Sequence, residues 1–352
     1  IRYRIDGVLR EAMSVPSRLA SGLVTRVKVM ADLDIAERRL PQDGRFSVES
    51  SGSKIDLRAA SLPTVHGEGV VLRLLDASTL EVDFVKLGFP QRDLQRYHKV
   101  FRRPYGTILA TGPTGSGKST TLYATLAALN SPEKKIITIE DPVEYRLAGL
   151  NQLQIHPRAG LTFASGLRSI LRADPDIVMI GEVRDPETAR TAVEAALTGH
   201  LVLATLHTND APSAVTRLAD MGVEPFLTAS AVDCVIAQRL ARKLCEECKR
   251  PASVSEESLR ALSFPFESAD DRTFFEAVGC ESCAGTGYRG RIGLFELMEI
   301  TADVRELIIN RSSSNDIGRA AEREGMLRLR DDGLLKAAQG ITSIEEILRT
   351  VV

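Results

Sequence analysis

The chain of 352 residues has no long apolar run, no excess of one charge, and no internal repeat or low-complexity tract. No window approaches 18 consecutive apolar residues, so the sequence predicts no membrane-spanning helix. A formal net charge of −2 gives none of the basic excess that nucleic-acid-binding proteins usually carry. No signal peptide is visible and the first residue is Ile1, so we expect the chain to begin inside a longer protein.

Cysteine is also scarce, and its spacing is informative. Four of the five cysteines form two C-x-x-C pairs, Cys245 with Cys248 and Cys280 with Cys283. Four thiolates complete a tetrahedral zinc site, so the pattern predicts a structural zinc in a reducing compartment. The 31 residues between the pairs exceed the usual spacing and predict an inserted loop at residues 251–273. A redox-active thiol pair is the alternative.

What the chain does contain is a glycine-rich segment, GPTGSGKST at residues 112–120, between an apolar strand and a helix. It fills the phosphate-loop pattern G-x-x-x-x-G-K-[ST], in which backbone N–H groups turn inward around a phosphate chain. Lys118 is expected to reach the β- and γ-phosphates, and the Ser119 hydroxyl to bind Mg²⁺. The alternative, a turn that binds nothing, does not explain three fixed residues at this spacing. The expected nucleotide contacts are Gly112, Pro113, Thr114, Gly115, Ser116, Gly117, Lys118, Ser119 and Thr120.

Predicted strands and helices alternate from residue 106 to residue 206. Strands are predicted at residues 106–111, 135–140, 176–180 and 201–206, and helices at residues 118–129, 163–173 and 187–197. This alternation is typical of a mainly parallel sheet covered on both faces, which binds ligands at the C-terminal ends of its strands. His207 follows the last of these strands, where it could sense a γ-phosphate or be an ordinary hydrogen-bonded histidine.

Acidic residues follow two of the predicted strands. Glu140, Asp141 and Glu144 place three carboxylates in five residues, which makes them candidates for a magnesium shell or for orienting water. An acidic surface turn is the alternative. Glu182 follows an apolar strand as in a Walker B arrangement, although Gly181 stands where the usual aspartate would be.

The first 89 residues predict a small α+β domain built on an antiparallel sheet. A hairpin is predicted around Asp6-Gly7 and a helix from Pro16, followed by short strands at residues 46–49, 54–60 and 70–75. Arg58 alternates away from the apolar residues of its strand, and Arg73 lies within an otherwise apolar strand. Arg58 is expected to face solvent or a partner, and Arg73 could be functional or simply discourage edge-to-edge aggregation.

The last third of the chain predicts packing elements rather than further chemistry. A linker is predicted at residues 76–90, and a strand at residues 292–300. Short helices are predicted at residues 303–310, 315–323, 326–339 and 343–351. Cys234, in a predicted helix, is interpreted as a buried apolar residue.

Taken in order, the motifs resemble those of the secretion-ATPase superfamily. They are the phosphate loop, IEDPVE, RADPDIVMIGEVRD and TGHLVLATLHTNDAPSA. The chain is more closely similar to the type II secretion and type IV pilus assembly ATPases, because YRIDGVL, RLPQDGR and HGEGVVLRLL resemble that family's second N-terminal domain. The cysteine pairs match its assembly-type members, whereas pilus retraction ATPases usually lack them. The resemblance covers essentially all 352 residues.

The resemblance implies roles for individual residues. Glu144 matches the glutamate that polarises the attacking water, and Glu182 matches the acid at the end of the Walker B strand. His207 matches the histidine of the His-box, and His200 opens that segment.

Arginines of the first domain match residues that complete a neighbouring subunit's site in a hexameric ring. The matching residues are Arg58 and Arg73, while Arg45 lies in an equally similar motif. An arginine delivered in trans stabilises the charge that develops during phosphoryl transfer.

The resulting expectation is an α/β protein with four parts. They are a small α+β, PAS-like domain (1–89), a RecA-like phosphate-loop ATPase core (90–240), a tetracysteine zinc module (241–295) and a C-terminal helical region (296–352). The implied function is a homo-hexameric motor that uses ATP, Mg²⁺ and Zn²⁺ to power pseudopilus or pilus assembly. It would be cytoplasmic and peripheral on the inner membrane.

The expected partners are inner-membrane platform and recruiting proteins, although the family's recruiting domain is not among these residues. No nucleic acid partner is expected. One alternative is a RecA-like DNA translocase, which the balanced charge argues against. Another is a nucleotide-gated zinc scaffold that does not hydrolyse ATP, for which Gly181 leaves room. The sequence leaves open whether the motor serves secretion or a pilus.

Overall fold

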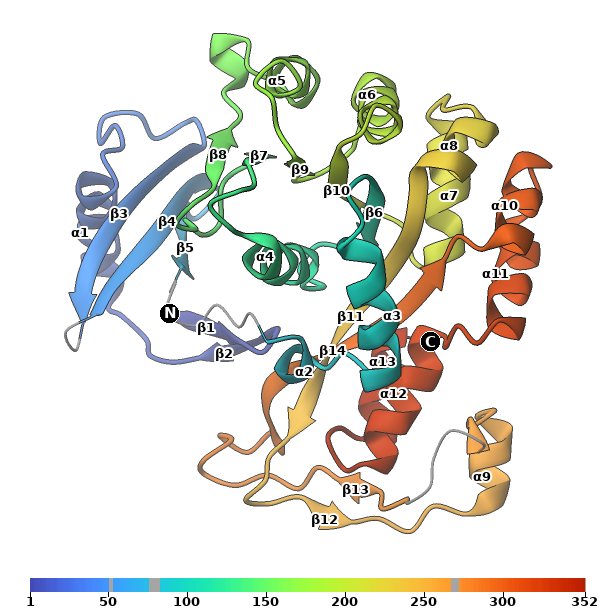
Figure 1. Cartoon of the computed structure of the whole chain (residues 1–352). Helices are drawn as coiled ribbons and strands as arrows, with labels where there is room; N and C mark the ends of the chain where they lie inside the picture. The colour runs from blue at the N-terminus through green and yellow to red at the C-terminus, as the bar shows by residue number, and fades with distance from the viewer. Residues whose placement is uncertain (51–52, 76–82, 267–271, 352) are drawn as a thin grey trace. The chain divides into compact units, whose positions relative to one another are not determined.

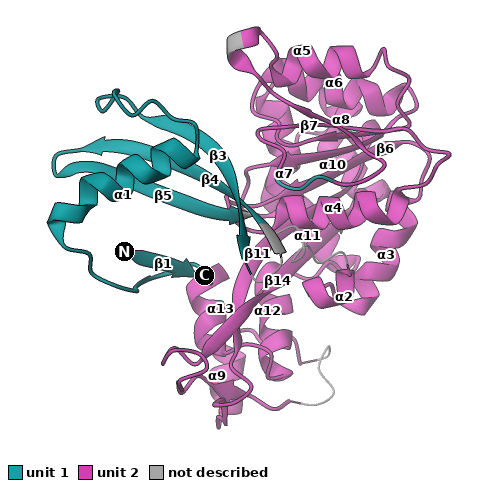
Figure 2. Ribbon diagram, turned by 90° about the vertical axis from the view of Figure 1, so that its left-hand side faces the viewer, with its two compact units in different colours: residues 1–80, 144–146 teal, residues 81–143, 147–352 magenta. Residues whose placement is uncertain are grey.

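The computed structural model describes residues 1–50, 53–75, 83–266 and 272–351. The chain divides into two compact units, which Figure 2 shows in different colours. Unit 1 comprises residues 1–80 with residues 144–146, and unit 2 comprises residues 81–143 and 147–352.

Unit 1 combines one helix with antiparallel strands. Its elements are β1 (Arg2–Ile5), β2 (Val8–Glu11), α1 (Ser17–Met30), β3 (Gln42–Ser50), β4 (Ser53–Thr64) and β5 (Gly67–Leu75). The predicted hairpin is present, with Asp6 (φ 48°) and Gly7 (φ 83°) in its turn. The end of α1 approaches β3 at Gly44, where a Cβ would lie 2.2 Å from the Ala31 carbonyl oxygen. The three-stranded sheet extends beyond the predicted strands because ladder pairing satisfies the backbone whatever the side chains are.

Unit 2 is built on a seven-stranded sheet with the order β14-β11-β6-β10-β9-β7-β8. Its strands are β6 (Gly106–Thr111), β7 (Ile136–Glu140), β8 (Asn151–Gln154), β9 (Ile177–Ile180), β10 (Leu201–Leu206), β11 (Val232–Leu244) and β14 (Tyr288–Glu299). Every pairing within it is parallel except that of β14 with β11. Strands β6, β7, β9 and β10 are buried along their whole length. The predicted parallel-dominated α/β sheet is confirmed.

Helices cover both faces of this sheet (Figure 1). The helices of unit 2 are α2 (Phe84–Leu87), α3 (Gln91–Phe101), α4 (Lys118–Leu129), η2 (Pro157–Ala159), α5 (Phe163–Ile170), α6 (Pro186–Leu197), α7 (Ala211–Asp220), α8 (Pro225–Ala231), α9 (Glu256–Ala261), α10 (Ala302–Ile309), α11 (Ser314–Arg323), α12 (Leu329–Ala338) and α13 (Ile344–Val351). Of these, α9 lies away from the sheet, beside β12 (Arg250–Pro251) and β13 (Phe275–Glu276). Several begin where a side chain accepts a hydrogen bond from the first turn: Thr162 caps α5, Asp185 caps α6 and Asp210 caps α7.

The second half of unit 2 differs from the sequence prediction in two places. Cys234 lies in β11 and not in a helix, because the β-branched residues around it pair with β6 on one side and β14 on the other. The segment predicted as an inserted loop, residues 251–273, contains α9. Strand β12 (Arg250–Pro251) lies at its start and β13 (Phe275–Glu276) follows it, and residues 267–271 lie outside the described residues. The predicted linker at residues 76–90 also lies partly outside them, and its described end forms α2.

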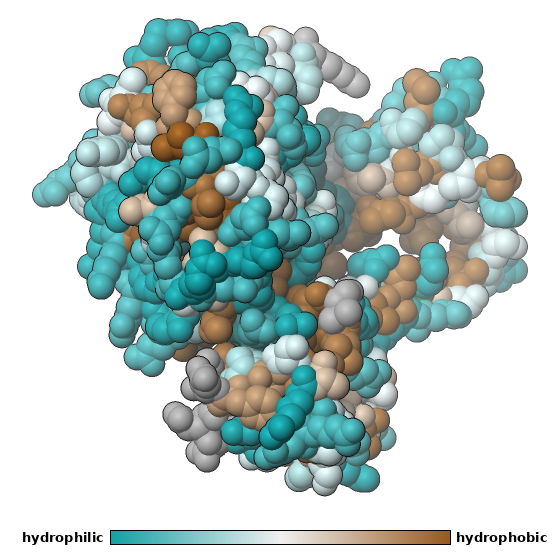
Figure 3. Space-filling model, turned by 90° about the vertical axis from the view of Figure 1, so that its right-hand side faces the viewer, coloured by the Kyte–Doolittle hydropathy of each residue, from teal (hydrophilic) through white to brown (hydrophobic). Residues whose placement is uncertain are grey.

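On the face seen in Figure 3, hydrophilic side chains cover much of the surface, and hydrophobic side chains gather in several patches between them. Within the described parts of the chain, no helix combines the length and the apolar character needed to cross a membrane.

Candidate nucleotide site and cysteine cluster

The phosphate loop has the backbone that its glycines predict. Three of them have positive φ, namely Gly112 (146°), Gly115 (79°) and Gly117 (91°). Gly112 has a second constraint, since a Cβ there would lie 2.4 Å from the Gln238 carbonyl oxygen. A side chain at this position would push β11 away from the loop, so glycine is required for packing as well as for conformation.

Lys118 lies across the loop that it follows. Its Nζ donates to the carbonyl oxygens of Gly112 (2.7 Å) and Pro113 (3.1 Å), and the residue is 8% exposed. Burial lowers the pKa of this ammonium to about 8, although the charge of Glu182 opposes the shift. No carboxylate among the described residues is hydrogen-bonded to this lysine, which is therefore available to an anion in the loop.

The hydroxyl groups of the loop are in different environments. Ser119 is exposed at the start of α4, as a hydroxyl that binds Mg²⁺ needs to be. Ser116 is buried, and its Oγ has no hydrogen-bond partner among the described residues. Thr114 is exposed.

Gln238 supports the loop from β11, and sequence reasoning missed it. Its Oε1 accepts a hydrogen bond from Thr121 Oγ1 (2.9 Å) in the first turn of α4, and its backbone oxygen faces Gly112. Gln238 is 2% exposed. No local motif marks this residue, because its partners lie more than a hundred positions earlier in the chain.

Glu182 and His207 meet at the ends of neighbouring strands. His207 Nε2 lies 3.4 Å from Glu182 Oε2, and Arg184 Nε lies 2.7 Å from the same oxygen. His200 does not join them, because it precedes β10 whereas His207 follows it. The His200 Nδ1 lies 2.9 Å from the Ala195 carbonyl oxygen, so its contact is with α6.

Gly181 has a structural reason to replace the usual aspartate. A Cβ at this position would lie 3.1 Å from Glu140 Cα and 3.2 Å from the Ile139 carbonyl oxygen. Both neighbours are backbone atoms of β7, which cannot easily move within the sheet. The acidic side chain is instead carried by the next residue, Glu182, which is 9% exposed.

The structure places the three clustered carboxylates, Glu140, Asp141 and Glu144, in different environments. Glu140 is 4% exposed and accepts hydrogen bonds from Tyr123 OH, from Thr138 Oγ1 (2.5 Å) and from Gln152 Nε2 (3.2 Å). These bonds indicate a structural role for Glu140 within the core. Asp141 is exposed.

In unit 1, three arginines stand in one row across the sheet. Arg45 lies opposite Arg58 on β3 and β4, and Arg58 lies opposite Arg73 on β4 and β5. Glu144, which belongs to unit 1, has its Oε1 3.8 Å from Arg73 Nη1 and 4.0 Å from Arg58 Nη1. Burial and then the neighbouring Arg58 lower the pKa of Arg45. Like charges opposite one another are unfavourable, so the row suits an anionic partner.

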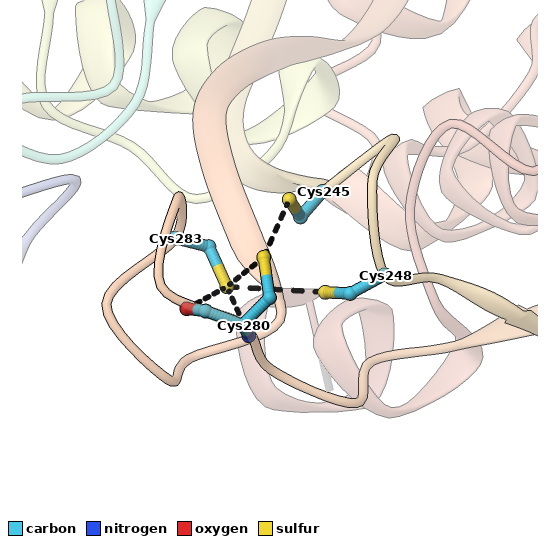
Figure 4. Close-up of side chains that lie close together, drawn as sticks. All are labelled: Cys245, Cys248, Cys280 and Cys283. Carbon is cyan, nitrogen blue, oxygen red and sulfur yellow. Dashed lines mark hydrogen bonds between the residues drawn. The ribbon is translucent and has the colours of Figure 1, made fainter.

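The four paired cysteines converge between the ends of β11 and β14 (Figure 4). Their Sγ atoms all lie within 4.8 Å of one another, with 3.8 Å from Cys245 to Cys280, 3.9 Å from Cys248 to Cys283 and 3.7 Å from Cys280 to Cys283. Zinc–sulfur bonds of about 2.3 Å in a tetrahedron place sulfurs roughly 3.8 Å apart, so the cluster fits four-thiolate zinc.

Backbone groups around the cluster also suit thiolates. Cys283 Sγ accepts N–H bonds from Cys280 (3.1 Å) and Gly287 (3.2 Å), and Cys248 Sγ accepts one from Gly279 (3.3 Å). Burial acts to raise the pKa of Cys283, but the amide bonds from Cys280 and Gly287, together with contacts to the Cys280 and Cys248 side chains, lower the pKa to about 6. The positive φ of Gly279 (113°) and Gly287 (73°) lets the backbone turn toward the sulfurs.

A strand, a glycine-rich loop and a helix carrying Lys118, with acidic and histidine side chains at adjacent strand ends, define a phosphate-loop nucleotide-binding protein. A family model described as "Type II/IV secretion system protein" matches residues 1–349. The chain therefore belongs to this family, which confirms the resemblance of its motifs.

Named relatives come from both pilus and secretion systems. The chain is 51% identical over 350 residues to the type IV pilus assembly ATPase PilB of Myxococcus xanthus, covering 99% of this chain and 62% of that protein. It is 50% identical over 349 residues to the type II secretion system ATPase E of Vibrio cholerae, covering 99% of this chain and 69% of that one. The chain thus spans less than two thirds of the pilus relative's length.

Solved structures share the fold. The pilus retraction motor PilT with bound ADP aligns with a TM-score of 0.68 at 26% identity, covering 99% of this chain and 89% of that one. The ATPase DotB of Legionella pneumophila aligns with a TM-score of 0.70 at 20% identity, covering 99% of this chain and 89% of that one. The second similarity shows the fold alone.

The lowered pKa of Lys118 predicts proton uptake on nucleotide binding. A bound triphosphate favours the charged ammonium, so at pH 8 we expect about half a proton to be taken up per ATP bound, and almost none at pH 6. Calorimetric titration in two buffers of different ionisation enthalpy measures this number. Lys118→Arg stays charged throughout and should show no uptake. Equal uptake by wild type and Lys118→Arg at pH 8 would contradict the assignment.

Proposed function

We propose that this chain is the motor portion of an ATPase that powers assembly of a pseudopilus or a type IV pilus. The observation that carries the proposal is the phosphate loop beside Glu182 and His207 at one edge of the sheet, in a chain of the type II/IV secretion family. The similarity to a solved motor with bound ADP also supports nucleotide binding. The relatives' names leave pilus and secretion systems as equal choices.

Within the site, each residue has a proposed task. The loop amides and Lys118 would hold the β- and γ-phosphates, while Ser119 and Glu182 would hold Mg²⁺. Bound Mg²⁺ supplies positive charge that offsets charge developing on the phosphates. Glu144 would orient and polarise the attacking water. His207 would sense the γ-phosphate, so that the position of its segment would depend on whether this phosphate is present.

We propose that the arginine row completes the site of a neighbouring subunit. Phosphate-loop enzymes gain much of their rate from an arginine placed opposite the loop lysine. The row of Arg45, Arg58 and Arg73 offers such a cation from a separate compact unit. The corresponding assembly is a homo-hexamer, in which the charge of Glu144 would be shared between these arginines and water.

The cysteine cluster is proposed to hold one structural zinc ion. Four thiolates leave no open coordination position, so the ion would have no part in hydrolysis. Its place in the fold supports a structural role, because Cys245 follows the last residue of β11 and Gly287 precedes the first residue of β14. A metal there would bind the two strand ends together.

Other parts of the proposal rest on the family alone. They are the division into domains at residues 89, 240 and 295, the PAS-like identity of the first domain, a cytoplasmic position on the inner membrane, and platform and recruiting proteins as partners. No described feature favours a nucleic acid partner.

The two acidic residues should separate by their magnesium dependence. Glu144→Gln is expected to bind ATP with Mg²⁺ normally but to hydrolyse it roughly 10²-fold more slowly, because only the activation of water is lost. Glu182→Gln should require more Mg²⁺ for half-maximal rate and should also be slow. Phosphate release measured across a magnesium titration distinguishes them. Glu194→Gln, on the exposed face of α6, is the control for surface charge, and Lys118→Ala is the inactive control. Identical titrations for the two acids would refute the division of roles.

Mixing two inactive variants tests the trans arginine. Arg73→Ala and Lys118→Ala should each be inactive alone, since a trans arginine is worth roughly 10³- to 10⁵-fold in rate. Together they should regain activity, because one contributes an intact loop and the other an intact arginine. Arg39→Ala, which alters an exposed arginine outside the row, should be fully active alone. Lack of rescue in demonstrated mixed assemblies would exclude Arg73 as the trans group.

Removal of one cysteine tests the zinc proposal. We expect about one zinc per chain by elemental analysis, and its loss in Cys280→Ser together with local unfolding around the ends of β11 and β14. ATP binding should persist, because Gln238, which contacts the phosphate loop, lies in the middle of β11, six residues before the strand ends at Leu244. Cys234→Ala, which alters a buried cysteine outside the cluster, should keep its zinc. Reversible disulfide formation without zinc would support the redox alternative.

A further inference from the structure

Glu296 is a buried acid on β14 that the proposed reaction does not use. It is 2% exposed, and its two carboxylate oxygens contact two different helices. Oε1 accepts from the backbone N–H of Ala211 (2.8 Å), the first residue of α7, and Oε2 accepts from that of Leu329 (3.2 Å), the first residue of α12. Strand β14 contacts both helices (Figure 1). One side chain therefore joins the starts of two helices that lie more than a hundred residues apart in the chain.

A continuous series of contacts leads from Ala211 to the phosphate loop. Asp210, which precedes Ala211, accepts through its backbone oxygen from Thr208 Oγ1 (3.0 Å). The same hydroxyl lies 2.7 Å from Thr111 Oγ1, which in turn accepts from Thr208 N (2.8 Å). Thr111 immediately precedes the loop, and His207 precedes Thr208. The position of the segment that contains His207 therefore depends on the position of Ala211.

We infer that Glu296 is a positioning residue that anchors the start of α7, and with it the His207 segment, to the start of α12. This inference rests on the proposed ATPase function and assigns no contact between Glu296 and nucleotide. The anchor needs both oxygens as acceptors, because each serves a different amide. A carboxylate provides two acceptors, whereas a carboxylic acid or a carboxamide provides one acceptor and turns a donor toward the other amide.

The charges around Glu296 make this anchor sensitive to pH. Helix N-termini attract a carboxylate, and Arg328 at the start of α12 does so as well. Burial acts in the opposite direction and is the larger effect, so the pKa of Glu296 rises to about 7, with Asp210 at the start of α7 contributing. On β11, Arg239 also faces it and is held by Asn209 Oδ1 (3.0 Å). Below pH 7 the acid form predominates and one of the two helix contacts is lost.

The test compares ATP hydrolysis by the full chain and by Glu296→Gln from pH 6 to pH 8. Glutamine imitates the protonated acid at every pH, so the ratio of wild-type to variant kcat should be near one at pH 6. It should rise to about tenfold at pH 8, with KM for ATP changed less than about twofold, because misplacement of a reacting group lowers kcat. Taking the ratio cancels the titration of Lys118, which both proteins share.

Glu299→Gln is the matched control. It makes the same substitution three residues along β14, where Glu299 pairs with Arg96 (2.5 Å) rather than with helix amides. Its ratio to wild type should not change with pH. A ratio near one at every pH for Glu296→Gln would overturn the inference while leaving the proposed function intact. Absence of any hydrolysis by wild type would instead overturn the proposed function and the inference together.

Hydrogen exchange provides a readout that does not depend on hydrolysis. At pH 8 the amides of Ala211 and Leu329 should both be protected in wild type, and one of them should lose protection in Glu296→Gln. Unchanged protection of both amides would overturn the bridge itself. If Glu296→Gln does not fold, Glu296→Asp replaces it, since a carboxylate one methylene shorter cannot reach both amides. Its kcat at pH 8 should fall about tenfold, and wild-type kcat would count against the inference.

Discussion

Parallel pairing of β6 with β10 on one side and β11 on the other is the constraint on which the nucleotide site depends. The register places Thr111 opposite Leu206 and opposite Ala237, so the three strands reach the same level together. The residues that follow are Gly112, His207 and Gln238. Residues from three distant parts of the chain therefore come together, because backbone hydrogen bonds align the ends of β6 and β10 with the middle of β11.

Residues on β11 and β14 contact the phosphate loop and three helices. Gln238 on β11 contacts the loop and the first turn of α4, while Glu296, opposite Ala237, contacts α7 and α12. At the far end, the same two strands lead directly into the cysteine cluster. A zinc ion there would hold the strand ends in register, which gives it a structural effect at a distance from the reaction.

Positive charge held in an unfavourable environment is a common feature of the residues proposed to meet phosphate. Lys118 is buried against carbonyl oxygens rather than a carboxylate, and its pKa is lowered in consequence. The row of Arg45, Arg58 and Arg73 sets like charges side by side across a sheet. Both arrangements cost stability in the absence of an anion. Each is therefore better explained by binding than by folding.

Local patterns in the sequence determined much of this protein. The phosphate loop, the two cysteine pairs and the alternation of strands and helices each depend on residues close together in the chain, so their spacing alone predicted a nucleotide fold and a metal cluster. The Asp6-Gly7 hairpin was predicted on the same basis. These features follow from backbone conformation and periodicity, which neighbouring residues control.

Only the tertiary structure decided how distant residues combine. The side chain of Glu140 is buried in the core, whereas that of its neighbour Asp141 is exposed. Cys234 lies in a strand because two partner strands, β6 and β14, are available to pair with it. Strand register added Arg45 to the arginine row, and packing brought Gln238 to the loop and Glu296 to two helix starts. No periodicity records these contacts, because they depend on which elements lie side by side after folding.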